Sequence, residues 1–141
     1  MTPHVIELRA RWGDVDAAGI AYYPRVFRWF DVAAEELFRA AGLPWGTLFP
    51  EAGIVGLPIL EAHCRFVAPI HYDDRLRIES RVEEVRDKVV RLAHRVLTQG
   101  RDDGTARLCA EGYEVRGWVE RLEGRLRARS IPELVRARLR P

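Results

Sequence analysis

The feature that most constrains this sequence is a long helical pattern between Arg25 and Ala41. Apolar residues recur there at spacings of three and four, the period of an amphipathic helix. Pro24 suits the first turn, where a missing N–H costs little, and Gly42 and Pro44 follow where helices usually end. Because burial rather than propensity stabilises such a helix, other parts of the chain must cover its wide apolar stripe. The stripe consists of Val26, Phe27, Trp29, Phe30, Ala33, Ala34, Leu37, Phe38 and Ala41.

The segments that can cover this helix alternate apolar and polar residues, as strands do. Turns are expected at Arg86–Lys88 and at Gly100–Gly104, and a short amphipathic helix at Pro132–Leu139. One central helix with about five antiparallel strands predicts an α+β domain in which the helix packs on one face of the sheet. The expected strands lie within residues 4–12, 53–67, 76–82, 90–96 and 106–119.

Length and charge narrow the class of protein. The 141 residues set the expectation of a single domain over residues 1–141. A net charge of +2 is small for a dedicated nucleic-acid binder. No apolar run approaches the roughly 18 to 20 residues of a membrane helix, and no charged-then-apolar leader opens the chain. We therefore expect a soluble cytoplasmic protein that binds neither nucleic acid nor membrane, with its two cysteines as thiols.

Several kinds of chemistry are disfavoured by what the sequence contains. Ser80 and Ser130 are the only serines, neither stands in Gly-x-Ser-x-Gly, and the sequence has no Gly-rich phosphate loop. The four histidines and two cysteines lack zinc-ligand spacing, so no metal is expected. His94 falls on the inward face of a predicted strand and is interpreted as a core histidine with satisfied hydrogen bonds.

Asp14 and Asp16 are the most suggestive pair of residues. They stand in a loop just before the aromatic helix, where a carboxylate can act as a base, a nucleophile or a cation ligand. Two structural alternatives remain open: Asp16 as a turn former, and Asp14 as a partner of Arg11. A calcium loop is disfavoured, because the following Ala17, Ala18 and Ile20 add no oxygen side chains.

The segment Trp12–Pro24, followed by Arg28–Asp31, closely resembles the active-site segment of the 4-hydroxybenzoyl-CoA thioesterase family. The resemblance runs from about Glu7 to about Arg125 and includes further segments in the same order. It implies a hotdog fold, an antiparallel sheet of about five strands wrapped around one long helix. It also implies homodimers that pair into homotetramers, and metal-free hydrolysis of an acyl-CoA to a carboxylic acid and free CoA. The further segments are Ala41–Trp45, Gly53–Ile59, Phe66–Val67 and Tyr72–Glu79.

The resemblance also assigns catalytic roles. Asp16 matches the catalytic carboxylate, which attacks the thioester carbonyl or activates a water molecule for that attack. The main-chain N–H of Tyr23, at the start of the helix, matches the donor that polarises the carbonyl oxygen. Gly19 is expected to let the loop turn tightly toward the substrate. Glu35 or Glu36 on the helix is an alternative base, ranked below Asp16.

Binding residues follow from the same resemblance. Tyr22, Trp29 and Trp45 are candidates for an aromatic acyl pocket, as is Trp12, although each can equally belong to the core. Asp31 matches a helical carboxylate that could accept a hydrogen bond from a substrate phenol. Its alternative is an ordinary solvated helix residue.

The expected CoA contacts are Arg86 and Lys88, in a turn that matches a basic turn of the family. Arginine and lysine both suit phosphate groups. Asp87 departs from the family pattern and puts the nucleotide contacts in doubt, so an ordinary charged hairpin remains the alternative.

Tyr22 and the Gly53–Gly56 segment favour the aromatic branch of these thioesterases. The predicted substrate is therefore an aromatic acyl-CoA, with 4-hydroxybenzoyl-CoA or a close benzoyl-CoA analogue as the best single choice. CoA is then part of the substrate, and no separate cofactor is expected. The alternatives are a thioesterase for short or medium aliphatic acyl-CoA, a non-catalytic module that binds acyl-CoA or an acyl carrier, and an oligomerising scaffold.

Overall fold

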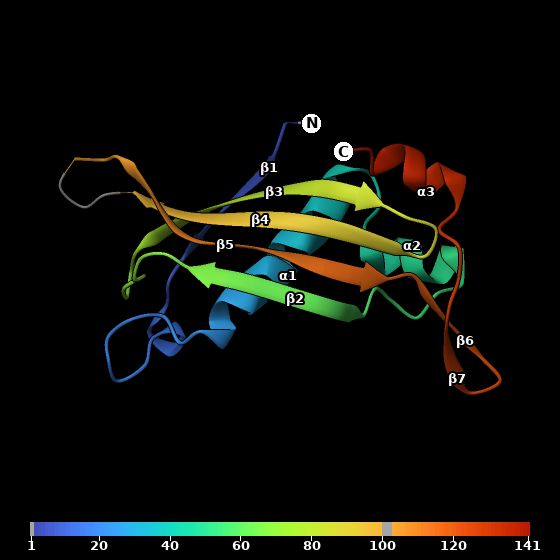
Figure 1. Cartoon of the computed structure of the whole chain (residues 1–141), viewed down its shortest axis with the longest axis horizontal. Coiled ribbons are helices and arrows are strands. Elements are labelled where there is room, and N and C mark those ends of the chain that lie inside the picture. Colours follow the sequence, from blue (N-terminus) through green and yellow to red (C-terminus); the bar gives the residue numbers. More distant parts are fainter. Residues whose placement is uncertain (1, 100–102) are drawn as a thin grey trace.

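The structure is a computed structural model that describes residues 2–99 and 103–141, and its centre is one antiparallel sheet (Figure 1). The sheet has five strands in the order β1-β3-β4-β5-β2, so β1 and β2 form its edges. This arrangement confirms the predicted α+β class. The strands are β1 His4–Arg9, β2 Ile59–Phe66, β3 Arg75–Val85, β4 Val89–Gln99 and β5 Ala106–Gly117.

The long helix α1, Pro24–Ala40, lies diagonally across one face of this sheet (Figure 1). Pro24 is in its first turn, as predicted. Gly42 follows the helix with a φ of 77°, a left-handed conformation that glycine adopts without steric cost, and the N–H of Leu43 returns to the carbonyl of Phe38 at 2.8 Å. The buried face of α1 is Val26, Trp29, Phe30, Ala33, Ala34, Leu37 and Phe38.

The space between α1 and the sheet holds two apolar clusters. The cluster toward the end of α1 includes Phe38, Leu92 and Trp118, and the one toward its start includes Phe30 and Val96. Four buried polar side chains lie at inward strand positions between the two clusters: Ser80, His94, Glu114 and Arg116.

Three smaller elements extend the fold beyond the sheet and α1. The final helix α3, Glu133–Arg138, confirms the prediction for residues 132–139. The helix α2, Trp45–Ala52, and the hairpin of β6, Val119–Leu122, with β7, Arg125–Ala128, were not predicted. The eight residues of α2 include Pro50, and the hairpin begins at residue 119, where the last predicted strand ended.

Of the two expected turns, the structure describes one completely and the other in part. Residues 86–88 join β3 to β4, where the Arg86 N–H donates to the Val89 carbonyl at 2.9 Å. The second expected turn, residues 100–104, falls partly outside the described residues. No helix in the described part of the chain has the length and apolar character needed to cross a bilayer.

The edge strand β2 is exposed and carries large apolar side chains. It pairs with β5 along one side. The close pairing depends on Gly112, because a Cβ there would lie 1.9 Å from the carbonyl oxygen of His63. Leu60 is 60% exposed and Phe66 51% exposed. Apolar side chains at an open sheet edge are the feature that pairing with another strand would cover.

Candidate active site

The loop between β1 and α1 folds back on itself before the helix begins. Val15 and Ala21 form an antiparallel bridge, and the Asp16 N–H donates to the Ile20 carbonyl at 3.0 Å. The turn is closed by the Gly19 N–H, which donates to the Asp16 carbonyl at 2.9 Å, and Gly19 has a φ of 79°. Asp16 therefore opens a tight turn just ahead of α1.

The Asp16 side chain is exposed and only partly engaged. One of its carboxylate oxygens accepts the Ala18 N–H at 2.8 Å, which is the geometry of an Asx turn. Within the described residues the other oxygen has no partner. Asp16 thus forms the turn and also presents a free carboxylate oxygen.

Asp14 holds the loop together instead. Its side chain accepts the main-chain N–H of Arg11 at 2.8 Å and lies 3.9 Å from Nε of Arg25. Its carbonyl accepts the Tyr22 N–H at 2.8 Å. Asp14 therefore ties the loop to the first turn of α1, in keeping with the structural alternative that pairs it with Arg11.

The first residues of α1 leave one main-chain donor available. The Tyr22 N–H is bonded to Asp14, and Pro24 has no N–H. No acceptor for the Tyr23 N–H occurs among residues 2–99 and 103–141. This donor stands at the N-terminus of a 17-residue helix, where the helix dipole favours negative charge.

An apolar cavity of about 340 Å³ borders this helix start. It lies between the beginning of α1 and the segment that follows β2, so the free N–H and an apolar volume are side by side. Its lining includes Ile20, Tyr23, Val26, Phe66, Val67 and Cys109.

The aromatic candidates are spread over the molecule. Tyr22 is 49% exposed and packs edge-to-face on Tyr23, beside the cavity. Trp29 is buried in the core and lines a different cavity, on the β1 side of α1. Trp45, on α2, stacks on Phe49. The structure therefore brings Tyr22 to the Asp16 loop and places Trp29 and Trp45 elsewhere, and Trp12 is exposed.

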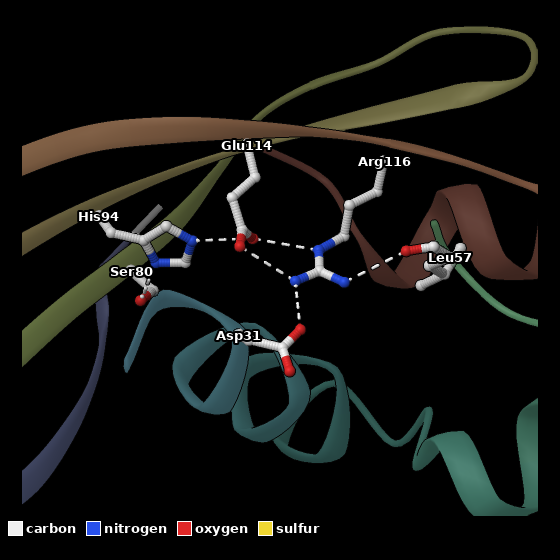
Figure 2. Close-up of polar contacts among 6 residues, drawn as sticks. All are labelled: Asp31, Leu57, Ser80, His94, Glu114 and Arg116. Carbon is white, nitrogen blue, oxygen red and sulfur yellow. Dashed lines mark hydrogen bonds and ion pairs between the residues drawn. The ribbon is translucent and has the colours of Figure 1, made fainter. Parts of the chain in front are cut away.

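Asp31 is the exposed end of a buried polar chain (Figure 2). Its Oδ1 accepts Nη2 of Arg116 at 2.7 Å. Nε and Nη2 of Arg116 also donate to the two carboxylate oxygens of Glu114, both at 3.0 Å. Glu114 continues to Nε2 of His94 at 3.2 Å, and Nδ1 of His94 lies 2.7 Å from Oγ of Ser80. His94 is thus the satisfied core histidine that the sequence predicts.

The charged groups of this buried polar chain stabilise one another. Burial opposes ionisation of Glu114, but hydrogen bonds from His94 and Arg116 outweigh it, so its pKa lies below the usual value. Burial likewise opposes the charge of Arg116, and Glu114 and Asp31 outweigh it, so the pKa of Arg116 is raised. The buried pair is therefore ionised at neutral pH.

The turn that carries Arg86 and Lys88 lies at the opposite end of the sheet from the Asp16 loop (Figure 1). The Arg86 side chain bonds Glu84 at 2.9 Å. Main-chain bonds anchor the turn, since the carbonyl of Lys88 accepts the Trp118 N–H at 2.9 Å. Within one chain, these two residues and Asp16 do not meet.

The alternative bases are engaged with a cation. Glu35 and Glu36 lie near the end of α1, each 3.3 Å from the Arg39 guanidinium. They are far along the helix from the free Tyr23 N–H. In the described part of the chain, no group of three or more His, Cys, Asp or Glu side chains could hold a metal ion.

Sequence reasoning did not single out Glu114 and Arg116. A signal was available, because both charges fall at inward positions of β5, in phase with the buried Ala110. Charged residues at the inward positions of a strand, where apolar residues are expected, have two explanations. Either the register has been assigned wrongly, or the charges belong to a buried network.

Comparison with known proteins gives four consistent matches: one family, one relative and two solved structures. Residues 10–139 match the family described as the Thioesterase-like superfamily. Over 128 residues, the chain is 36% identical to a 4-hydroxybenzoyl-CoA thioesterase of Pseudomonas sp. (strain CBS-3), with 90% of each chain covered. A solved structure of a 4-hydroxybenzoyl CoA thioesterase mutant complexed with 4-hydroxybenzoyl CoA has a TM-score of 0.92 and 33% identity, covering 99% of this chain and 100% of that one. A solved gentisyl-coenzyme A thioesterase has a TM-score of 0.80 and 34% identity, covering 96% and 98%.

Proposed function

The chain belongs to the thioesterase-like superfamily, and on that premise we propose that it hydrolyses 4-hydroxybenzoyl-CoA, or a close aromatic analogue, to the free acid and CoA. Its sheet around α1 is the hotdog fold. The observation that carries the function is the likeness, over nearly the whole chain, to a thioesterase complexed with that substrate. The acyl groups named for the similar proteins are aromatic acids with ring hydroxyls, which supports the aromatic branch.

The proposed catalytic pair is the Asp16 carboxylate and the Tyr23 main-chain N–H. The free carboxylate oxygen either attacks the thioester carbonyl carbon or takes a proton from the water that does. The Tyr23 N–H donates to the carbonyl oxygen as negative charge develops on it. If Asp16 attacks, the C–S bond breaks to leave a mixed anhydride with Asp16, and water then cleaves the bond between the acyl group and Asp16. If water attacks, it adds to the carbonyl carbon directly and the C–S bond breaks in the same way. In both routes water supplies the second oxygen of the acid, and the proton that it gives up leaves with CoA as the thiol. Gly19 contributes by allowing the turn that presents Asp16.

The proposed acyl site uses the apolar cavity beside Tyr23 and the polar group on α1. Asp31 lies eight residues beyond Tyr23, about 12 Å along the helix axis. It would accept the hydrogen bond of a ring hydroxyl. Tyr22, which packs on Tyr23, is the best placed of the aromatic candidates. Trp29 is buried in the core, and Trp45 lies 5.3 Å from the Arg116 guanidinium that holds Asp31.

A homodimer completes the proposed site. The exposed apolar edge at Leu60 and Phe66 supports pairing of β2 with β2 of a second copy. In a two-fold dimer the two β2 strands run antiparallel, so the start of β2 in one copy lies beside the end of β2 in the other. The Arg86 and Lys88 turn of one copy then approaches the Asp16 loop of the other, where the CoA phosphates would bind.

Further parts of the proposal rest on the family match. They are a single hotdog domain over residues 1–141, pairing of dimers into a tetramer, a cytoplasmic location, and no cofactor beyond the CoA of the substrate.

A substrate panel tests the function. Purified protein is assayed for thiol release from 4-hydroxybenzoyl-CoA, benzoyl-CoA and hexanoyl-CoA. We expect the highest kcat/KM with the hydroxylated aromatic thioester. A kcat/KM for hexanoyl-CoA well above both aromatic values would contradict the substrate assignment. Saturable binding of the thioesters without thiol release would identify a non-catalytic binding module instead.

A further inference from the structure

The buried polar chain beneath α1 reaches the protein surface at one carboxylate, that of Asp31. Ser80, His94, Glu114 and Arg116 are each 3% exposed or less. The Asp31 side chain, by contrast, is 59% exposed. Buried polar and charged groups cost free energy unless they are bonded, and here a chain of hydrogen bonds connects all four groups to Asp31 (Figure 2).

Charge balance within the buried polar chain does not require Asp31. Glu114 already neutralises Arg116 through two bonds of 3.0 Å. Asp31 adds a second carboxylate at 2.7 Å, so the three groups together carry one excess negative charge. Oδ1 of Asp31 faces Arg116, and among the described residues its Oδ2 has no partner. Asp31 therefore presents a free acceptor atom at the surface.

The guanidinium that holds Asp31 cannot readily move. Its Nη1 donates to the Leu57 carbonyl at 3.2 Å, so that four of its five N–H groups are engaged. It also lies 5.3 Å from the centroid of the Trp45 ring. The direction of the Asp31 carboxylate is thus set by a partner fixed on three sides.

We propose that Arg116 is a positioning residue, which orients Asp31 to accept the hydrogen bond of a ring hydroxyl and thereby sets a preference for hydroxylated over unsubstituted aromatic acyl-CoA. This inference rests on the proposed function, because it needs an aromatic thioester in the site. A phenol that donates to a carboxylate forms a charge-assisted bond. When the bound acyl group excludes water from Oδ2, the analogue without the hydroxyl is disfavoured, since this acceptor then stays unpaired.

Arg116→Lys separates positioning from charge. Lysine keeps the positive charge, but an ammonium group cannot bind Glu114 through two parallel bonds while also holding Asp31. The measured quantity is the ratio of kcat/KM for 4-hydroxybenzoyl-CoA to kcat/KM for benzoyl-CoA. We expect Arg116→Lys and Asp31→Ala each to lower this ratio about tenfold, the value of one charged hydrogen bond.

The double variant tests whether Arg116 acts through Asp31. If it does, Arg116→Lys in the Asp31→Ala background lowers the ratio no further. The matched control is Arg39→Lys. It alters an exposed ion pair on α1, the helix that carries Asp31, and should leave the ratio unchanged. If Arg116→Lys does not fold, Glu114→Gln with Arg116→Met removes both buried charges together and takes its place.

The outcomes separate the two proposals. A ratio unchanged in Arg116→Lys, or losses that add in the double variant, would overturn the positioning role while the thioesterase function stands. A wild-type protein that hydrolyses neither aromatic thioester would overturn the proposed function, and this inference with it.

Discussion

One carboxylate oxygen of Asp16 accepts the main-chain N–H of Ala18 at 2.8 Å, and this bond fixes the side chain at the mouth of its turn. Within the described residues the other oxygen has no hydrogen-bond partner. Asparagine in this position can make the same turn bond with its amide oxygen, but it has no negative charge. Replacement by asparagine therefore removes the proposed chemistry and keeps the loop.

The free N–H of Tyr23 gives a direct test of the main-chain donor. Tyr23 has a φ of −52°, which proline tolerates, so Tyr23→Pro deletes the donor with little change in its own backbone angle. We expect kcat to fall about 10²- to 10³-fold, the usual effect of losing one such donor.

The control for that variant is Tyr23→Phe, which changes the side chain and keeps the N–H. It should stay within a few-fold of wild type in kcat. Equal losses in the two variants would show that the side chain, not the main chain, is responsible. Circular dichroism of both proteins checks that α1 still forms.

Most of the fold could be predicted from the sequence because its signals are local. The period of α1 and the alternation of β3 and β4 are both visible over short windows. Helix α2 escaped prediction, because Gly46 and Pro50 within eight residues conceal its helical period. The β6–β7 hairpin was missed because its strands have only four residues each, too few to show a clear alternation.

The site was less accessible to sequence reasoning. Asp16 and Tyr23 stand in one contiguous motif, so resemblance could propose them as the catalytic pair. Asp31 and Arg116 are 85 residues apart, and a contact between distant segments leaves no periodic trace. An inward charged position on β5 is the sole local sign of that contact.

Close pairing of β2 with β5 should require glycine at position 112. A Cβ at this position would lie 1.9 Å from the His63 carbonyl oxygen and 2.9 Å from Cα of Cys64. Gly112→Ala must therefore push β2 away from β5, at a cost of about 1–3 kcal/mol. Thermal unfolding should show a midpoint several degrees lower, since each kcal/mol corresponds to about 4 °C.

Gly46→Ala is the matched control, because a Cβ at Gly46 meets nothing within 4 Å. Gly46 lies in α2, where alanine should raise stability by up to about 1 kcal/mol. Similar midpoints for the two variants would contradict the close β2–β5 packing.

The exposed edge predicts how subunits associate. Leu60→Glu places a charge on the apolar edge of β2 and should produce a protein that sediments as a monomer, whereas wild type sediments as a dimer or tetramer. Leu134→Glu is the control, since Leu134 is 67% exposed on α3, away from that edge. Dissociation by Leu134→Glu and not by Leu60→Glu would place the interface elsewhere.

Cys64 should react slowly with alkylating agents. Burial raises the pKa of its thiol to about 11, compared with 9.0 ordinarily. At pH 8 the native thiolate fraction is then about 100-fold below that of the unfolded chain. Alkylation by iodoacetamide, followed by mass spectrometry, should keep accelerating about tenfold per pH unit up to pH 10. A plateau above pH 9 would contradict the raised pKa.

The most direct test of the catalytic role of Asp16 is the turnover of 4-hydroxybenzoyl-CoA by Asp16→Asn, measured as thiol release beside wild type. We expect kcat to fall about 10²- to 10⁴-fold, because the base or nucleophile is gone, while the thermal midpoint stays close to that of wild type. An Asp16→Asn protein with kcat within about threefold of wild type would contradict the assignment of Asp16 as the catalytic carboxylate.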